Sequence, residues 1–165
     1  MNKRVPMSEL SPLIAEVLEG GGEVVLRVTG TSMLPMLRHR RDRVCLVRPP
    51  EAPLGKYDLP LFVRPDGRHI LHRIAAKKQR GYVTIGDNQC VSEYPVLPSQ
   101  IVAVAKGFYR DDKYVSCEDA GYRIYSRIWV FLFPLRRFCQ KGKRLLAKVV
   151  ASVSRGTRER TIGLT

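Results

Sequence analysis

The repeated alternation of short apolar runs with Pro, Gly and Asp residues, from Val24 to about Gly107, most constrains the fold. Short runs bounded by turn residues are typical of β-strands, and several of them at close spacing predict a coiled antiparallel sheet or a partial barrel. The fold class is therefore mainly β. We expect strands at residues 23–29, 43–47, 61–64, 70–75, 82–85 and 101–108.

Two connections in this region also have clear signals. The stretch Arg64-Pro65-Asp66-Gly67-Arg68 predicts a hairpin turn, because Pro presets its own backbone angle and Gly permits the left-handed region. This turn would pair the strand at 61–64 with the strand at 70–75. The proline-rich stretch at 49–53 predicts a loop.

The segment before the first strand predicts an amphipathic helix within residues 1–22. Ser8 or Ser11 can cap its start, and the glycines at 20–22 end it. Its apolar residues recur at helical spacing, so we expect one side of the helix to pack on the β domain. These residues are Leu10, Leu13, Ile14, Val17 and Leu18.

The chain divides into three expected parts: the helix at 1–22, a β domain at 23–120 and a tail at 121–165. The full length of 165 residues is enough for one domain with a buried core. We find no signal peptide and no apolar segment of the ~20 residues that a membrane-spanning helix needs. The sequence therefore predicts a cytoplasmic location.

Ser32 stands in the stretch Gly-Thr-Ser-Met-Leu-Pro at 30–35, directly after a β-branched run. Gly30 permits a tight turn at the strand end, so the hydroxyl of Ser32 would project from it. A serine in a turn is also an ordinary local hydrogen-bonding residue. A catalytic interpretation therefore requires matching motifs further along the chain.

Two further boxes occur downstream in order, the pair His72-Arg73 and the triplet Gly86-Asp87-Asn88. With the Ser-Met box they resemble the superfamily of signal peptidase I and the self-cleaving LexA-type repressors. The His-Arg pair makes the resemblance closest to signal peptidases of the endoplasmic-reticulum and SipW type, in which histidine replaces the catalytic lysine. It covers about residues 24–107 and implies that superfamily's catalytic β fold.

The resemblance implies a Ser-His-Asp arrangement. Ser32 would be the nucleophile and His72 the base, since a hydroxyl needs a positioned base and histidine titrates near neutral pH. Asp87 would orient the imidazole and stabilise its protonated form. Met33 and Pro35 would border the bound substrate.

Other residues are expected to support the nucleophile. Backbone N–H groups at the Ser32 turn, next to Thr31 and Met33, would form an oxyanion hole. Many bacterial signal peptidases have a second donor, a serine, where this chain has Gly30. Ser92 matches a supporting serine of the bacterial enzymes, whereas the acidic residue of their pattern is Tyr94 here.

Each member of the expected triad has an alternative. His39 lies in a basic cluster and is expected at the surface, and His69 precedes His72 by three residues. In an extended strand His69 and His72 face opposite sides unless a bulge intervenes. Asp87 could instead cap a turn, which would leave a Ser-His dyad.

The four cysteines, Cys45, Cys90, Cys117 and Cys139, are widely spaced and include no Cys-x-x-Cys pair. This spacing argues against a zinc site. We expect free thiols, no metal and no other cofactor.

Positive charge is concentrated in the tail. Residues 121–165 carry eleven basic side chains and one acidic side chain, and the whole chain has a net charge of +14. The apolar run at 128–135, which contains Trp129, has basic flanks and suits a helix in an anionic membrane interface. An equally weighted alternative is that the run packs on the β domain. No motif for specific nucleic-acid binding accompanies the charge.

The resemblance thus implies a serine endopeptidase that cleaves an extended precursor or leader peptide after small residues. It would reside in the cytoplasm, with the tail as an additional contact to a membrane surface. The alternative is a non-catalytic or self-processing relative of the LexA-type regulators that acts as a peptide-binding module. Against this alternative, too little chain precedes Ser32 for a DNA-binding domain, and the base position lacks lysine.

Overall fold

The computed structural model describes residues 7–138, and the β domain is its main feature. The chain forms two compact units, Met1–Val130 and Phe131–Thr165. All strands of the described residues lie in the first unit. Residues 139–165 of the expected tail, including Cys139, lie outside the described residues, as do residues 1–6.

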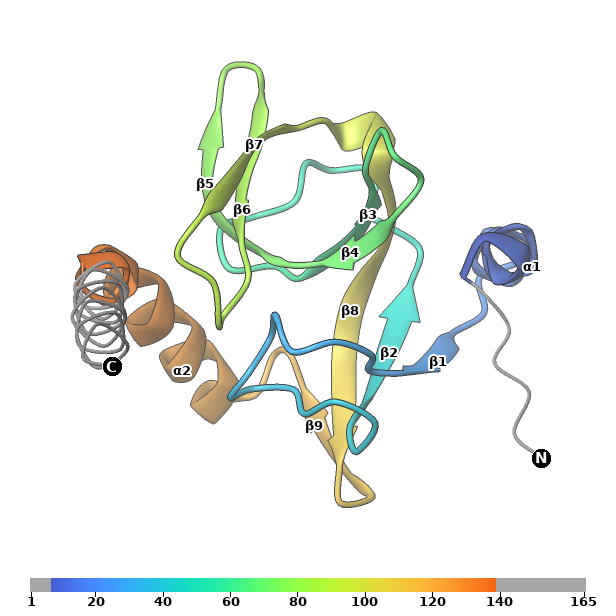
Figure 1. The fold of residues 1–165 in the computed structure, drawn as a ribbon. Helices are drawn as coiled ribbons and strands as arrows, with labels where there is room; N and C mark the ends of the chain where they lie inside the picture. Colours follow the sequence, from blue (N-terminus) through green and yellow to red (C-terminus); the bar gives the residue numbers. More distant parts are fainter. Residues whose placement is uncertain (1–6, 139–165) are drawn as a thin grey trace, which may run out of the picture. The chain divides into compact units, whose positions relative to one another are not determined.

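Within the described residues the strands form a six-stranded and a three-stranded antiparallel sheet, so the protein is mainly β, as predicted. The larger sheet has the order β1-β2-β8-β3-β4, with β9 also paired to β8, and it curls into a half barrel (Figure 1). Its strands are β1 (Val24–Arg27), β2 (Arg43–Val47), β3 (Pro60–Val63), β4 (His69–Leu71), β8 (Ile101–Arg110) and β9 (Lys113–Ser116).

The smaller sheet has the order β5-β6-β7, with strands β5 (Arg73–Lys78), β6 (Gly81–Ile85) and β7 (Ser92–Val96). A single residue, His72, separates β4 of the larger sheet from β5 of the smaller sheet. The strand predicted at 70–75 is therefore divided at this histidine. The backbone remains tied to the larger sheet there, because the amide of His72 donates to the carbonyl of Pro60 at 3.3 Å.

The predicted hairpin is confirmed. β3 pairs with β4 so that Val63 lies opposite His69, and the amide of Arg64 donates to the carbonyl of Arg68 at 2.9 Å. Strands β7 and β9 were not expected. β7 contains Pro95, which cannot donate a ladder hydrogen bond. β9 has only four residues and pairs antiparallel with the end of β8.

Helix α1 (Met7–Glu19) precedes β1 and packs on the main apolar core through Ile14 and Leu18, both buried. Leu13 and Val17 are exposed, so the packing face is narrower than the five apolar positions suggest. A second cluster of buried residues lies between the curled strands and includes Phe62, Ile74 and Tyr82.

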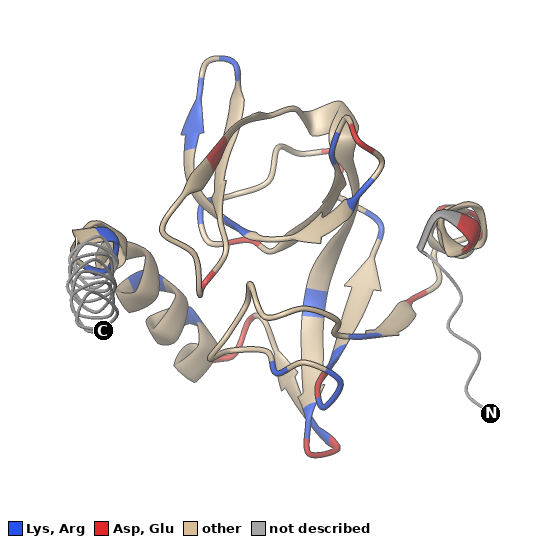
Figure 2. Ribbon diagram, viewed as in Figure 1, with Lys and Arg blue, Asp and Glu red and all other residues tan. Residues whose placement is uncertain are grey.

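Helix α2 (Ala120–Phe131) follows a short 3-10 turn, η1 (Pro98–Gln100), and strands β8 and β9 in the chain. Basic residues lie along α2 and on the connections of the strands (Figure 2). Among residues 7–138 no helix is both long and apolar enough to cross a membrane. In the second unit, residues 133–138 are helical, and Leu135 and Phe138 are exposed.

Candidate active site

The turn that carries Ser32 is held in place by the loop between β6 and β7. Gly30 adopts a φ of +96°, a conformation that other residues rarely adopt. The amide of Asn88 donates to the carbonyl of Ser32 at 2.7 Å, and Asn88 Nδ2 donates to the carbonyl of Thr31 at 3.2 Å. Ser32 itself is half-buried. The Gly-Asp-Asn box therefore fixes the path of the Ser-Met box.

His72 is fully enclosed, with 1% of its surface exposed. The edge of the ring meets the buried ring of Phe62, with centroids 6.1 Å apart. Packing of this kind restricts the rotation of the imidazole. The two ring nitrogens consequently have fixed and different surroundings.

Ser32 and His72 converge at Gly86. A Cβ placed on Gly86 would lie 2.8 Å from the carbonyl oxygen of Ser32 and 3.0 Å from Nε2 of His72. Both distances are below ordinary van der Waals contact, so no side chain fits at this position. The structure thus brings the expected nucleophile turn and the expected base together beside one glycine, although they are forty residues apart in sequence.

The other imidazole nitrogen faces a carboxylate that the sequence reasoning missed. Nδ1 of His72 lies 3.0 Å from Oε1 of Glu93, at an angle outside that of a regular hydrogen bond. Glu93 is also held by Arg64, whose Nε and Nη2 donate to its two oxygens at 2.7 and 2.5 Å. Glu93 lies in β7 opposite Thr84 of β6. Only the pairing of the unexpected strand β7 brings it to the histidine.

Burial and neighbouring charges shift the pKa values of His72 and Glu93. Burial lowers the pKa of His72 below its ordinary value of 6.5; Glu93 opposes the shift, and Arg64 adds to it. Burial also disfavours the Glu93 anion, but Arg64 and His72 hold the pKa of Glu93 below its ordinary value of 4.5. At neutral pH the site therefore contains a neutral imidazole beside a carboxylate, the state that a general base requires.

Asp87, the expected third member of the triad, is paired with Arg73. Nε and Nη2 of Arg73 donate to the two oxygens of Asp87 at 3.0 and 2.8 Å, and neither side chain is exposed. The carboxylate that lies at Nδ1 of His72 is Glu93, whereas the expected Asp87 pairs with Arg73. The arginine of the His-Arg box serves to neutralise the aspartate of the Gly-Asp-Asn box.

Helix α2 completes the surroundings of this buried ion pair. Arg73 Nη1 donates to the hydroxyls of Tyr122 and Ser126 at 2.9 and 2.7 Å. The hydroxyl of Tyr125 donates to Asp87 Oδ2 at 3.2 Å. The indole N–H of Trp129 donates to the carbonyl of Asp87 at 2.9 Å. Trp129 is half-buried, so this part of the expected membrane-facing run packs on the β domain.

The remaining predicted site residues have varied positions. Thr31 and Pro35 are exposed beside Ser32, and Ser92 is half-buried at the start of β7. The side chain of Met33, expected to border a substrate, has only 3% of its surface exposed and packs in the main core. The backbone N–H of Met33 can still belong to an oxyanion hole.

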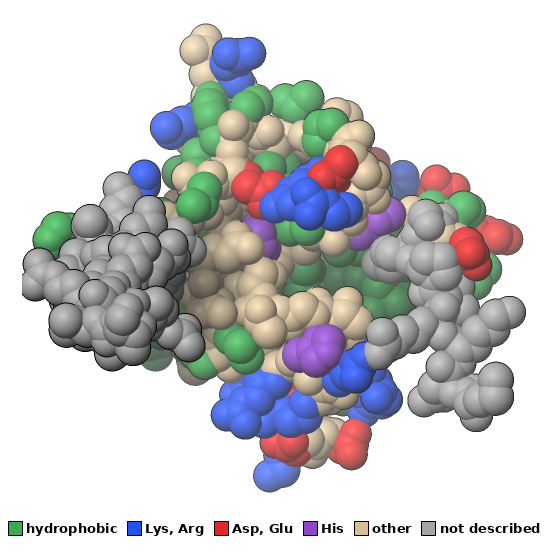
Figure 3. All heavy atoms as spheres, viewed as in Figure 1, with side chains coloured by type: hydrophobic (Ala, Val, Ile, Leu, Met, Phe, Trp, Pro, Cys, Tyr) green, Lys and Arg blue, Asp and Glu red, His purple; other side chains and the backbone are tan. Residues whose placement is uncertain are grey.

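The competing histidines have other partners. His39 is exposed and accepts a hydrogen bond from the amide of Gly30 at 2.9 Å. Nε2 of His69 lies 3.1 Å from the hydroxyl of Ser11 in α1. Figure 3 shows histidine side chains on the face that also carries a cluster of acidic and basic groups. Of the three histidines, His72 is the one beside the Ser32 turn and a carboxylate.

Cys45 and Cys117 lie in surroundings that disfavour the thiolate. Burial raises the pKa of Cys45 and of Cys117 to about 11, which makes both thiols poor nucleophiles at neutral pH. Among residues 7–138, no group of three or more His, Cys, Asp or Glu side chains could hold a metal ion.

Comparison of the sequence with models of known protein families found no match. No curated protein matches it either. The assignment of a function therefore depends on the geometry of the site and on the order of the three boxes.

Proposed function

We propose that the protein is a serine endopeptidase in which Ser32 is the nucleophile, His72 the general base and Glu93 the carboxylate partner of the base. One observation carries the proposal: Nε2 of His72 and the Ser32 turn meet at Gly86, while Nδ1 of the same ring lies 3.0 Å from Glu93. A neutral imidazole with a carboxylate behind it is suited to accept a proton from a hydroxyl.

In the proposed reaction, Nε2 of His72 accepts the proton of the Ser32 hydroxyl as its oxygen attacks the peptide carbonyl. Glu93 stabilises the imidazolium that forms, and backbone N–H groups at the Ser32 turn stabilise the oxyanion. The imidazolium then protonates the leaving amine. A water molecule, deprotonated by His72, hydrolyses the acyl-enzyme and regenerates the serine.

The resemblance to signal peptidases supports a substrate class. We propose that the substrate is an extended segment of a precursor or leader peptide with small residues before the scissile bond.

A library of synthetic peptides tests the proposal. Purified full-length protein is incubated with mixed peptides rich in Ala, Gly and Ser, and new termini are identified by mass spectrometry. Ser32→Ala and His72→Ala are expected to reduce cleavage by about a thousandfold or more. Ser99→Ala, at an exposed serine of η1, is the matched control and is expected to leave cleavage unchanged.

Thermal melting of each variant separates loss of chemistry from loss of fold. Cleavage retained by folded Ser32→Ala would refute the nucleophile assignment. Peptide binding by the wild-type protein without any cleavage would instead favour the peptide-binding module.

A further inference from the structure

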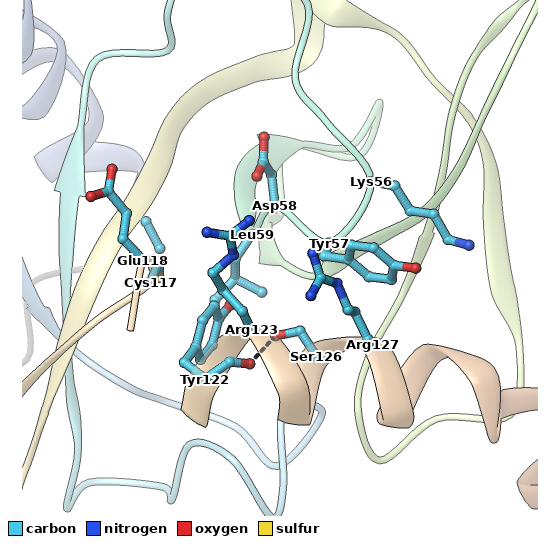
Figure 4. Close-up of a pocket in the computed structure, with 11 residues that line it drawn as sticks. Lys56, Tyr57, Asp58, Leu59, Cys117, Glu118, Tyr122, Arg123, Ser126 and Arg127 are labelled. Carbon is cyan, nitrogen blue, oxygen red and sulfur yellow. Dashed lines mark hydrogen bonds between the residues drawn. The ribbon is translucent and has the colours of Figure 1, made fainter. Parts of the chain in front are cut away.

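A cavity of about 430 Å³ lies beside α2 and is not part of the proposed catalytic site. Its walls come from the loop before β3, from β8, from the segment after β9 and from α2 (Figure 4). Ser32, His72 and Glu93 do not line it. Its volume falls within the range of small-ligand sites.

Cations dominate the opening of this cavity. Lys56, Arg123 and Arg127 line it and are exposed. Two carboxylates, Asp58 and Glu118, also line it, so the excess charge is positive. Asp58 Oδ2 accepts a hydrogen bond from the amide of Gly55 at 2.8 Å, and burial raises the pKa of Asp58. The lining thus offers donors for an anion and acceptors for hydroxyl groups.

Backbone contacts fix the position of Tyr57 in the cavity wall. Tyr57 adopts a φ of +84°, which costs free energy for a residue with a side chain. Its amide donates to the carbonyl of Ile74 at 2.9 Å, and its carbonyl lies 3.4 Å from Nη1 of Arg73. Lys56 Nζ lies 5.0 Å from the centre of the Tyr57 ring. These contacts hold an aromatic wall and a cation together at the cavity.

Helix α2 presents three kinds of residue around its axis. Tyr122 and Ser126 are buried against the β domain, and Arg123 and Arg127 follow on the side that lines the cavity. The next positions, Ile124 and Ile128, are exposed by 55% and 51%. At about 100° per residue, the two arginines therefore lie between the packed face and an exposed apolar face.

We propose that this cavity binds the headgroup of an anionic phospholipid that carries hydroxyl groups, such as phosphatidylglycerol, and so holds α2 against a membrane surface. Arg123, Arg127 and Lys56 bind the phosphate, because guanidinium groups match its oxygens. Asp58 and Glu118 accept hydrogen bonds from the glycerol hydroxyls. The acyl chains pass over Ile124 and Ile128.

A lipid accounts for features that a soluble anion does not. A free phosphate would use only the cations, whereas a lipid also uses the apolar face directly beside them. Each cation near an anionic membrane surface contributes about fivefold in affinity. This proposal does not depend on the peptidase chemistry, since the residues involved differ from those of the catalytic site.

Vesicle sedimentation of the full-length protein tests the proposal. Vesicles of phosphatidylcholine alone are compared with vesicles that also contain phosphatidylglycerol. The double variant Arg123→Gln, Arg127→Gln is expected to lose about thirtyfold in affinity for the anionic vesicles. The matched control, Lys77→Gln with Arg80→Gln, removes the same charge from the β5–β6 hairpin and is expected to lose less than about threefold.

Two results would overturn the proposal. Equal losses in both double variants would show that only net charge attracts the protein to the vesicles. The variant Ile124→Ser, Ile128→Ser is expected to weaken vesicle binding while leaving the affinity for glycerol phosphate unchanged. If it leaves vesicle binding unchanged, the cavity takes a soluble anion and the lipid assignment is wrong.

Discussion

At the scale of single residues, the candidate base experiences two opposite charges. Glu93 lies at Nδ1 of His72 and raises its pKa, while Arg64, bound to the same carboxylate, lowers it. Burial has the larger effect and lowers the pKa below 6.5. The imidazole therefore remains neutral at pH values where an exposed histidine would already be half protonated.

These opposite effects predict opposite shifts in the pH dependence of cleavage. Activity rises as His72 loses its proton, so the acidic limb lies below pH 6.5. Glu93→Gln removes a charge that raises the pKa of His72, so we expect the acidic limb to move to lower pH. We also expect kcat to fall by about a hundredfold. Arg64→Gln removes a charge that lowers the pKa of His72, so we expect the acidic limb to move to higher pH. Profiles of kcat/KM against pH measure both shifts.

The neighbouring variant Arg68→Gln serves as a control for these profiles. Arg68 is exposed and paired with Asp66 in the hairpin turn, so its loss is expected to leave the limb in place. Shifts in the same direction for Glu93→Gln and Arg64→Gln would contradict the assigned electrostatics.

Gly86 permits a second prediction. A methyl group in Gly86→Ala would lie within 3.0 Å of His72 Nε2 and of a backbone oxygen of Ser32, so one of them must move. We expect a loss of about 1–3 kcal/mol in the free energy of unfolding, as in an overpacked core. Because the displaced groups are the nucleophile turn and the base, we also expect cleavage to fall by at least about a hundredfold.

Gly121→Ala is the control for Gly86→Ala. A Cβ at Gly121 would have no atom within 4 Å, and alanine favours the helix. Urea unfolding and peptide cleavage of both variants check the prediction. Wild-type cleavage by Gly86→Ala would mean that the active geometry does not depend on this contact.

The sequence predicts the two motifs that depend on local spacing, and the structure brings both beside Gly86. Ser32 follows a glycine turn and His72 precedes an arginine, and both signals are readable within a few positions. Glu93 was missed because its position beside His72 depends on β7, a strand that contains Pro95. The bacterial signal peptidase pattern has an acidic residue a few positions after the Gly-Asp-Asn box, and this signal could have indicated Glu93. On this chain, however, the spacing of that pattern places the acidic residue at Tyr94.

At the scale of elements, α2 holds the loop that carries Asp87 in place through hydrogen bonds. Residues 122, 125, 126 and 129 recur at helical spacing, and all four donate to or accept from the Arg73–Asp87 pair. The same loop binds the Ser32 turn through Asn88. Packing of α2 is therefore connected to the nucleophile by a short chain of hydrogen bonds.

Trp129→Phe tests this connection. The substitution keeps an aromatic ring but removes the N–H that donates to the carbonyl of Asp87. We expect a loss of about 1–3 kcal/mol in the free energy of unfolding. We also expect a lower kcat, because the Asp87–Asn88 loop becomes less fixed.

Ile128→Ala is the control for Trp129→Phe. Ile128 is the preceding residue on the exposed face of α2, and its loss is expected to change neither quantity in the absence of membranes. Differential scanning calorimetry and steady-state kinetics on a soluble peptide distinguish the two variants. An unchanged kcat in a destabilised Trp129→Phe would limit α2 to a structural role.

Some helices and strands match their predicted positions more closely than others. The strands at β2, β6 and β8 lie close to their predicted positions, because apolar runs and turn residues define them. The apolar pattern before β1 indicates a broad helical face, but α1 buries a narrower one, since Leu13 and Val17 are exposed among the described residues. Tertiary packing, which the sequence pattern does not contain, decides which apolar residues are buried.

At the scale of the whole molecule, the compact unit that contains the β domain extends past residue 121, where the expected basic tail begins. The sequence places a tail at 121–165, whereas residues up to Trp129 contact the buried ion pair. The compact unit that contains the β domain ends at Val130. Charge composition marks where basic residues begin, but it does not show which of them belong to a packed helix.

Two truncations test this boundary. A chain that ends after Val130 retains the contacts of α2 with Asp87 and is expected to keep a wild-type kcat on soluble peptides. A chain that ends after Tyr122 loses Ser126 and Trp129, which exposes a buried ion pair to water. We expect a lower Tm and a lower kcat from this shorter chain. Equal kinetics for both truncations would show that α2 does not support the site.

The crossing of the chain from β4 to β5 at His72 has a practical consequence for dissecting the protein. The chain passes between the two sheets at His72 and again between β7 and β8, so a cut directly beside His72 separates the histidine from β4 or from β5. A cut in the exposed turn at Asp66–Gly67 leaves the histidine with both β4 and β5. Complementing fragments divided there would regain hydrolysis only on reassembly, so the protein could serve as a split reporter whose signal requires both halves.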